Sequence, residues 1–153
     1  MARAAFAPAK VNLFLHVGAP AAAGYHPICS LMAFADVGDR VSTFEAEALA
    51  LRVVGPFAHD LTDQNDNLVL RAARALIAEA RRPVAPVGLR LDKRLPVASG
   101  LGGGSSDAGA ALRLLREALG LSIDNDRLAV LAGSLGSDGA ACLWGAPAIA
   151  EGR

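Results

Sequence analysis

Residues 95–108 read LPVASGLGGGSSDA, with four glycines between positions 100 and 104 and two serines directly after them. Such a run is either a slack connection or a loop kept small so that a ligand can approach its backbone. The segments on both sides decide between the two. Upstream, apolar residues alternate with polar residues or glycine from Val87 to Asp92, which predicts a strand that ends near Lys93.

Downstream of the glycines, the sequence has the apolar period of a helix. The apolar positions are Ala108, Ala111, Leu112, Leu115 and Leu119. We expect this helix to open at Ser106 and to end at Gly120, with Ser105, Ser106 or Asp107 as its N-cap. The glycines therefore join a strand to a helix with little slack, and an ordered loop is the better interpretation.

An ordered loop in this position is suited to an anion. The first amide groups of a helix have no partner inside it, and the helix dipole adds positive potential there. Glycines let a phosphate reach these amides. Two common motifs are excluded, because GxxxxGK[ST] needs a lysine that is absent and Ser105 replaces the third glycine of GxGxxG. The sequence thus predicts a phosphate loop of another kind over residues 96–106.

Near the N-terminus, residues 10–17 alternate strictly between two sets of side chains. This period predicts a strand with one buried face. The face that we expect to be buried comprises Val11, Leu13, Leu15 and Val17. The opposite, polar face carries Lys10 and Asn12.

The remaining segments complete the predicted fold. Further extended segments are expected at 25–35, 41–45 and 49–54, a turn at 37–40, and helices at about 69–80 and 126–135. The tail from Cys142 indicates more buried structure but no closing element. Strands thus cluster early and helices follow, which is an α+β arrangement and not regular βαβ alternation.

Composition limits the class of protein. A chain of 153 residues with 53% hydrophobic and 20% charged residues is one globular domain. Fifteen basic and fifteen acidic residues balance, which argues against nucleic acid as the main partner. Cys29 and Cys142 stand alone, as free thiols do in a reduced cytosol. No apolar run is long enough to span a membrane, so we expect a cytoplasmic protein without a membrane partner.

Three separated segments carry a family resemblance: PAKVNLFLHV at 8–17, LPVASGLGGGSSDA at 95–108 and LGSDGAAC at 135–142. Together they resemble the GHMP kinase superfamily of small-molecule kinases. With GYH at 24–26 and DVGD at 36–39, the narrower resemblance is to the branch that acts on a cytidine-diphosphate-linked methylerythritol.

The resemblance implies an α+β fold like the second domain of ribosomal protein S5, with a mixed or antiparallel sheet packed against helices. It implies that residues 1–153 are the N-terminal, ATP-binding domain and that the C-terminal domain is absent from this chain. The implied reaction is ATP-dependent phosphorylation of the 2-hydroxyl of that substrate, in isoprenoid precursor synthesis. Mg²⁺ is implied with ATP. No carboxylate cluster identifies its ligands, and Ser106 is the one hydroxyl contact that we consider.

The resemblance also implies roles for individual residues. Asp138 matches the catalytic carboxylate, which orients the hydroxyl and accepts its proton, and Lys10 matches the catalytic lysine beside it. Asn12, Tyr25 and His26 match substrate-binding positions, the last two at the cytidine end. Without the resemblance, an aspartate in GSDG is more often a turn or capping residue and a strand lysine is more often solvated.

The implied ATP-binding residues form one larger set. They are Asn67, Lys93, Pro96, Val97, Ala98, Ser99, Gly100, Leu101, Gly102, Gly103, Gly104, Ser105 and Ser106. Outside the loop, Asn67 can equally be a helix cap and Lys93 a surface lysine.

Other functions stay open at this point. The chain can be a kinase of the same superfamily for homoserine or mevalonate, or a non-catalytic nucleotide-binding fragment. From a different class, it can be a nucleic-acid-binding or structural module. Neutral net charge and the lack of an aromatic and basic stripe count against that module. The sequence predicts no oligomeric state.

Overall fold

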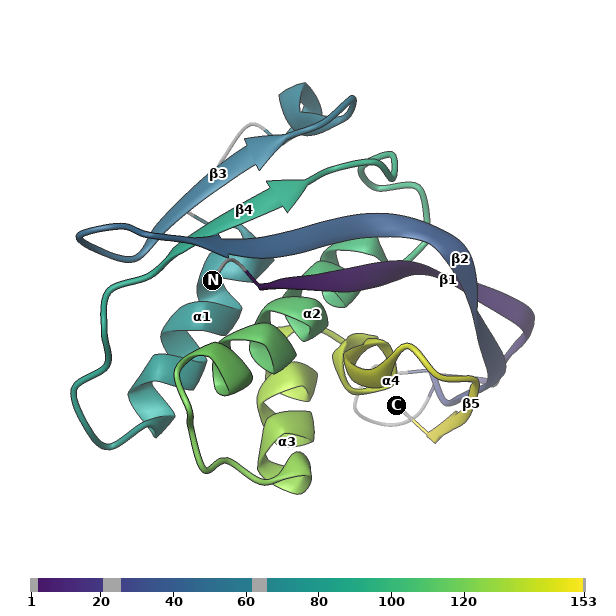
Figure 1. The fold of residues 1–153 in the computed structure, drawn as a ribbon. Helices are drawn as coiled ribbons and strands as arrows, with labels where there is room; N and C mark the ends of the chain where they lie inside the picture. Colours follow the sequence, from purple (N-terminus) through teal and green to yellow (C-terminus); the bar gives the residue numbers. More distant parts are fainter. Residues whose placement is uncertain (1–2, 21–25, 62–65, 153) are drawn as a thin grey trace.

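The computed structural model describes residues 3–20, 26–61 and 66–152. Within them the chain folds into one sheet with helices packed against one of its faces (Figure 1). The elements in chain order are β1 (Ala4–Val17), β2 (Ile28–Phe44), β3 (Ala50–Val54), a 3₁₀ turn (Ala58–Asp60), α1 (Leu68–Glu79), β4 (Gly88–Asp92), α2 (Gly103–Ala118), α3 (Asn125–Leu135), α4 (Gly139–Trp144) and β5 (Ala148–Gly152). The predicted α+β class is confirmed.

The sheet has the order β1-β2-β4-β3, and β5 pairs with the other end of β2 from β4, at residues 28–32. Most pairs are antiparallel, whereas β3 and β4 are parallel. The parallel pair follows from the connection, since α1 crosses between the two strands and returns the chain in the same direction. β2 is thus the central strand, and both the glycine loop after β4 and the hairpin with β1 are anchored to it.

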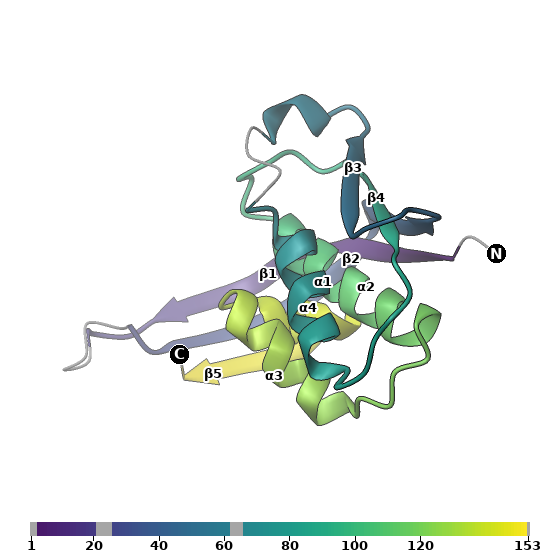
Figure 2. The same cartoon turned by 90° about the vertical axis from the view of Figure 1, so that its left-hand side faces the viewer.

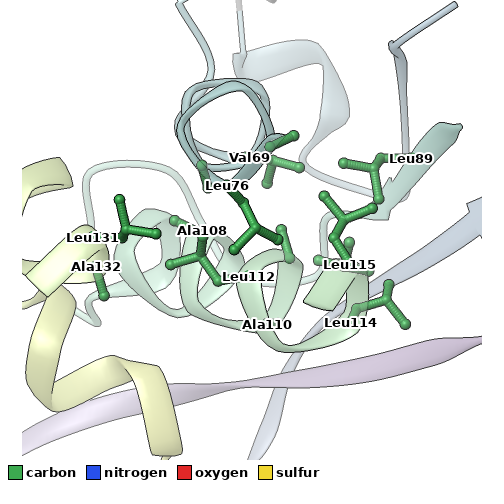
Figure 3. Close-up of a cluster of buried hydrophobic side chains, with 14 of the residues drawn as sticks. Val69, Leu76, Leu89, Ala108, Ala110, Leu112, Leu114, Leu115, Leu131 and Ala132 are labelled. Carbon is green, nitrogen blue, oxygen red and sulfur yellow. The ribbon is translucent and has the colours of Figure 1, made fainter. Parts of the chain in front are cut away.

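The core lies between the sheet and the helices α1 and α2 (Figure 3). Leu76 of α1 and Leu112 and Leu115 of α2 are fully buried. Leu89 and Leu91 of β4 meet them from the sheet. Both helices therefore bury the apolar faces that their sequence period predicts. Among the described residues, no helix has the length and apolar character needed to cross a membrane.

β1 departs from the predicted alternation. Its register against β2 shifts twice, between Pro8 and Lys10 and again between Asn12 and Phe14. Each shift changes the face on which the following side chains lie. Lys10, expected on a polar outer face, is buried and 5% exposed, whereas Leu13 is 63% exposed.

The expected buried face of β1 is therefore wrong. Val11, Leu13, Leu15 and Val17 are all at least 40% exposed. Leu15 and Val17 lie beyond the second register shift, on the part of the β1–β2 hairpin that projects past the helices (Figure 2).

The turn expected at 37–40 is also absent, because β2 continues from Ile28 to Phe44. Gly38 stands opposite Pro8, and a Cβ built on it would lie 2.2 Å from the carbonyl oxygen of Ala7. The glycine permits this close approach of the two strands inside the sheet and does not mark a turn. As a result the neighbouring Asp39 is carried on a strand and is fully buried.

The C-terminal part contains two elements that the sequence did not predict. α4 follows α3 directly, and β5 adds to β2 by pairing Ile28 with Gly152 and Met32 with Ala148. The tail therefore returns to the sheet, contrary to the expectation that it lacks a closing element.

Candidate active site

The glycine loop runs from Lys93 to Gly102 and leads into α2. The helix begins at Gly103, and its N-cap is Gly102, with φ of 62° and no side-chain cap. The prediction that Ser105, Ser106 or Asp107 caps a helix opening at Ser106 is therefore wrong. The positive φ explains the failure, since a glycine can end the loop in a left-handed conformation without a capping side chain.

The glycines are constrained by the fold as well as by any ligand. A Cβ on Gly102 would lie 3.0 Å from Cβ of Lys10, and one on Gly103 would lie 3.0 Å from Nζ of Lys93. A Cβ on Gly104 would meet only the tip of the Leu68 side chain, at 3.1 Å. Two of the glycines thus make room for lysines, and Gly104 lies at the edge of an open space, with only the tip of Leu68 close to it.

That space is a cleft of about 400 Å³ between the loop, the first turn of α2 and the start of α1. All the residues implied on the ATP side line it except Ser106. Leu61, Asp66, Leu68 and Asp107 complete the wall. The free amides of the first turn of α2 belong to this wall, so the cleft has the features of an anion site.

Ser106 differs from its neighbours. Its side chain is fully buried and does not line the cleft. Helical period explains this, because Ser105 and Ser106 are about 100° apart around the helix axis. The implied contact of Ser106 with ATP or with a metal ion stays a prediction.

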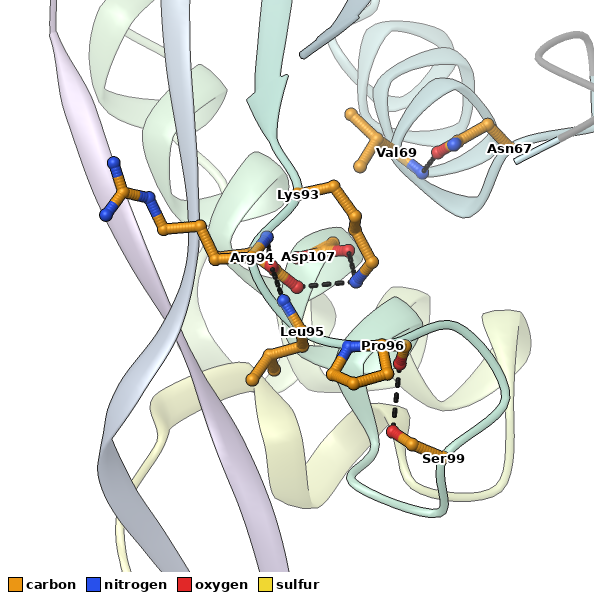
Figure 4. Close-up of polar contacts among 9 residues, drawn as sticks. Asn67, Val69, Lys93, Arg94, Leu95, Pro96, Ser99 and Asp107 are labelled. Atoms are coloured by element: carbon orange, nitrogen blue, oxygen red, sulfur yellow. Dashed lines mark hydrogen bonds and ion pairs between the residues drawn. The ribbon is translucent and has the colours of Figure 1, made fainter. Parts of the chain in front are cut away.

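Asn67 is both the N-cap of α1 and part of the cleft lining. Its Oδ1 accepts a hydrogen bond of 2.9 Å from the amide of Val69, which caps α1 (Figure 4). It also lines the cleft. Ser99, within the loop, donates to the carbonyl of Pro96 at 2.9 Å and closes a local turn there. The loop and the start of α1 are therefore both fixed by their own hydrogen bonds.

Lys10 and Asp138 come together beside the loop. Nζ of Lys10 donates to Oδ2 of Asp138 at 2.8 Å, and the side chains are 7% and 30% exposed. The Lys10 amide donates to the carbonyl of Leu101 at 2.8 Å, so this pair is tied to the loop itself. Asp138 precedes α4 but makes no capping hydrogen bond. The capping interpretation of Asp138 is thus not supported.

Tight helix packing places Asp138. Gly139 follows it, and a Cβ there would lie 1.9 Å from the carbonyl oxygen of Ala132 in α3. A Cβ on Gly109 of α2 would likewise lie 2.9 Å from Cα of Leu143 in α4. The two glycines let α4 sit against both α2 and α3, which brings Asp138, the residue just before α4, to Lys10.

The implied substrate residues are more dispersed. Asn12 donates to Ser30 at 2.6 Å, and Ser30 donates to the carbonyl of Phe14 at 2.8 Å. His26 pairs through Nδ1 with the carbonyl of Gly18 at 2.9 Å, at the exposed end of the hairpin. Tyr25 lies outside the described residues. Neither Asn12 nor His26 lines the cleft described above.

A buried charged cluster at the loop was not predicted. Nζ of Lys93 lies 2.5 Å from Asp39 and 3.0 Å from Asp107 (Figure 4 shows the contact with Asp107). Lys93 is therefore not a surface lysine. Burial lowers the pKa of its ammonium group, but the Asp107 and Asp39 carboxylates outweigh that effect and hold it above the ordinary value.

The pKa of the Asp107 carboxyl is also raised. Burial raises its pKa to about 7, the nearby Asp39 charge adds to the rise, and Lys93 opposes it. Neither aspartate was singled out from the sequence as part of a charged cluster, because the three residues come from distant segments. The only available signal was the lysine at the end of a strand directly before the glycines.

The comparisons with known proteins agree with this geometry. The family of GHMP kinase N-terminal domains matches residues 67–146, just over half of the chain and all of the glycine loop. The chain belongs to the GHMP kinase family.

Individual GHMP kinases extend the match over nearly all of the chain. The 4-diphosphocytidyl-2-C-methyl-D-erythritol kinase of Caulobacter sp. (strain K31) is 62% identical over 97% of this chain and 51% of its own length. The kinase of the same name from Caulobacter vibrioides (strain NA1000 / CB15N) is 59% identical over 100% of this chain and 53% of its own. The chain thus spans about half the length of these curated relatives.

A solved GHMP kinase has the same fold. The crystal structure of a 4-(cytidine 5'-diphospho)-2C-methyl-D-erythritol kinase superposes with a TM-score of 0.80 and 37% identity, over 99% of this chain and 52% of the other. The predicted family and fold are confirmed.

In this GHMP kinase domain, no three His, Cys, Asp or Glu side chains gather in a metal-binding group within the described ranges. Two carboxylates outside the buried cluster lie at the site, Asp66 in the lining of the cleft and Asp138 beside Lys10.

Proposed function

We propose that the chain is the ATP-binding half of a kinase that phosphorylates the 2-hydroxyl of 4-diphosphocytidyl-2-C-methyl-D-erythritol. The observation that carries this proposal is the Lys10–Asp138 ion pair, tied by the Lys10 amide to the glycine loop. A carboxylate that orients a hydroxyl then lies directly beside a cleft suited to phosphates.

Each part of the site has a role in this reaction. The amides of the first turn of α2 and the loop backbone bind the ATP phosphates. Asp138, 30% exposed, accepts the proton of the substrate hydroxyl. Lys10 holds the Asp138 carboxylate in place and offsets negative charge as the phosphoryl group is transferred. Asn12, Tyr25 and His26 contact the substrate, the last two at its cytidine end.

Mg²⁺ accompanies ATP in this proposal. When bound with ATP, the cation would offset the negative charge of the phosphate groups.

The domain organisation is part of the same proposal. Residues 1–153 form the N-terminal, ATP-binding domain, and a C-terminal domain of similar length completes the substrate cleft. The length of the relatives supports this, as each of the two Caulobacter kinases is about twice as long as the region matched.

The test uses the chain and an extended version. In the extended version, the remaining half of the Caulobacter sp. (strain K31) kinase follows residue 153. ADP formation is measured with the diphosphocytidyl substrate, with homoserine, with mevalonate and with no acceptor. We expect ADP to form only with the first, and only in the extended version.

Two results would change the proposal in different ways. Equal turnover of homoserine or mevalonate would retain the kinase and reject the substrate. Failure of the chain to bind ATP in a titration, together with no turnover by the extended version, would reject the kinase itself.

A further inference from the structure

A cluster of three buried charged residues joins both ends of the glycine loop to the sheet. Asp39 on β2 is fully buried, and Lys93 after β4 and Asp107 on α2 are each 3% exposed. Lys93 donates to both carboxylates, at 2.5 and 3.0 Å. Burying three charges is unfavourable unless they are paired, so this arrangement needs a reason beyond packing.

Asp39 holds the start of the loop. Its Oδ1 accepts from the amides of Arg94 and Leu95 at 2.5 and 2.8 Å, and its Oδ2 accepts from Lys93. Three donors thus converge on one carboxylate of the central strand. The path of the chain out of β4 and into the loop is fixed by these contacts.

The Asp107 carboxylate has fewer hydrogen-bond partners than that of Asp39. Its Oδ2 accepts from Lys93, but its Oδ1 is buried and has no hydrogen-bond partner within the described residues. With Asp39 and Lys93 both charged, an ionised Asp107 gives the cluster a net charge of −1 and a protonated one gives zero. A pKa of about 7 means that both states are populated at neutral pH.

The cluster lies next to the expected phosphate position. A Cβ on Gly103, the first residue of α2, would lie 3.0 Å from Nζ of Lys93 and 3.6 Å from Oδ2 of Asp39. Lys93 and Asp107 both line the cleft. An anion bound at the first turn of α2 therefore repels an ionised Asp107 and favours the protonated form.

Two further titratable groups, Lys10 and Cys142, lie beside Gly102 at the start of α2. Lys10 on β1 is engaged with Asp138 at the start of α4. Burial raises the pKa of the Cys142 thiol on α4, which keeps it neutral. The charged groups that act on Asp107 are thus Lys93 from the end of β4 and Asp39 from β2.

We propose that Asp39, Lys93 and Asp107 position the glycine loop for a nucleotide phosphate, and that phosphate binding is coupled to protonation of Asp107. The inference rests on the ATP binding proposed above. Asp39 and Lys93 fix the loop, and Asp107 takes up a proton from solvent so that no net negative charge remains beneath the phosphates.

The test is calorimetric titration of MgATP into the chain at pH 7, in buffers with different heats of ionisation. The number of protons taken up on binding is the slope of the observed binding enthalpy against the ionisation enthalpy of the buffer. We expect the wild type to take up as much as about half a proton more than Asp107→Asn. Asp39→Asn should lose the same uptake, since a single carboxylate beside Lys93 leaves no excess negative charge. Asp126→Asn, an exposed aspartate on α3, is the matched control and should behave as the wild type.

A second measurement needs no variant. If Asp107 must be protonated, MgATP affinity of the wild type falls as the pH rises from 6 to 8.5, by up to about tenfold per unit above pH 7. Equal proton uptake by the wild type and Asp107→Asn, or constant affinity over this range, would overturn the coupling while the ATP site stands. No binding of MgATP by the wild type would overturn both.

Discussion

Nζ of Lys10 lies 2.8 Å from Oδ2 of Asp138, although 128 positions separate them in the chain. The contact joins the segment of β1 between its two register shifts to Asp138, the residue just before α4. It requires the register shift that turns Lys10 inward and the glycine that lets α4 approach α3. Two separate packing features therefore converge on one ion pair.

This pair should be required for turnover and not for nucleotide binding. In the extended enzyme, Asp138→Asn should lower kcat by about 10²- to 10⁴-fold, because the amide cannot accept the hydroxyl proton. The Kd for MgATP should change by less than about threefold, or about 0.6 kcal/mol. Asp126→Asn is the matched control, and near-normal turnover of Asp138→Asn would show that the assigned role is wrong.

Substitutions of two glycines should distinguish an effect on folding stability from an effect on MgATP binding. Gly102→Ala should lower the free energy of unfolding by about 1–2 kcal/mol, since alanine resists the left-handed conformation at φ of 62°. Gly104→Ala should leave it within about 0.5 kcal/mol, because its methyl meets only a flexible Leu68 tip. It should nevertheless raise the Kd for MgATP by about tenfold. Urea unfolding and ATP titration of both variants provide the measurements.

The opposite result for either variant would contradict the role assigned to that glycine. If Gly104→Ala binds MgATP as tightly as the wild type, the phosphates do not approach the first turn of α2. If Gly102→Ala is as stable as the wild type, the N-cap conformation is not required.

Asp107 should make stability depend on pH. Its pKa is raised from 3.8 to about 7 in the folded chain, so the folded state binds more protons than the unfolded state between these values. Its contribution to stability is complete below about pH 4 and is lost as the pH rises through about 7. Asp107→Asn cannot titrate, and its free energy of unfolding relative to the wild type should rise by up to about 4 kcal/mol between pH 4 and 8.5. Urea unfolding across this range tests it, and a difference that does not change with pH would contradict it.

The exposed side chains of β1 should contribute little to folding. Leu13→Ala should change the free energy of unfolding by less than about 0.5 kcal/mol, as Leu13 is 63% exposed. Leu112→Ala, at a fully buried position of α2, should cost about 2–5 kcal/mol. Chemical denaturation of the two variants side by side tests the register of β1. A large loss from Leu13→Ala would mean that this side chain is buried.

Helices were the most predictable part of the fold. The faces of α1 and α2 follow directly from their apolar period, and Leu76 and Leu112 are buried as that period requires. The strand before the glycines was predictable for the same reason, since β4 alternates without interruption.

Predictions from the local sequence pattern were wrong where pairing with a neighbouring strand determines the structure. Gly38 has the appearance of a turn residue, yet it is needed for close contact with Ala7. The alternation at 10–17 is regular in sequence, but the register shifts depend on how β2 pairs with it. No property of a single segment contains this information.

The candidate site was predictable only in part. The positions of Lys10 and Asp138 came from family motifs, and the structure brings them together. The predicted capping role of Ser106 was wrong because α2 begins earlier, at Gly103, after the N-cap Gly102. The Asp39–Lys93–Asp107 cluster was not found, because it depends on three segments meeting through the sheet.

The two register shifts of β1 bear on how this strand tolerates change in length. Removing one residue between Pro8 and Lys10 would leave a strand able to pair with β2 but would turn the lysine away from Asp138. Many substitutions on the exposed positions of the hairpin should be accepted, whereas single-residue insertions and deletions upstream of Lys10 should not. We therefore expect this strand to tolerate substitutions of its exposed side chains more readily than any change in its length.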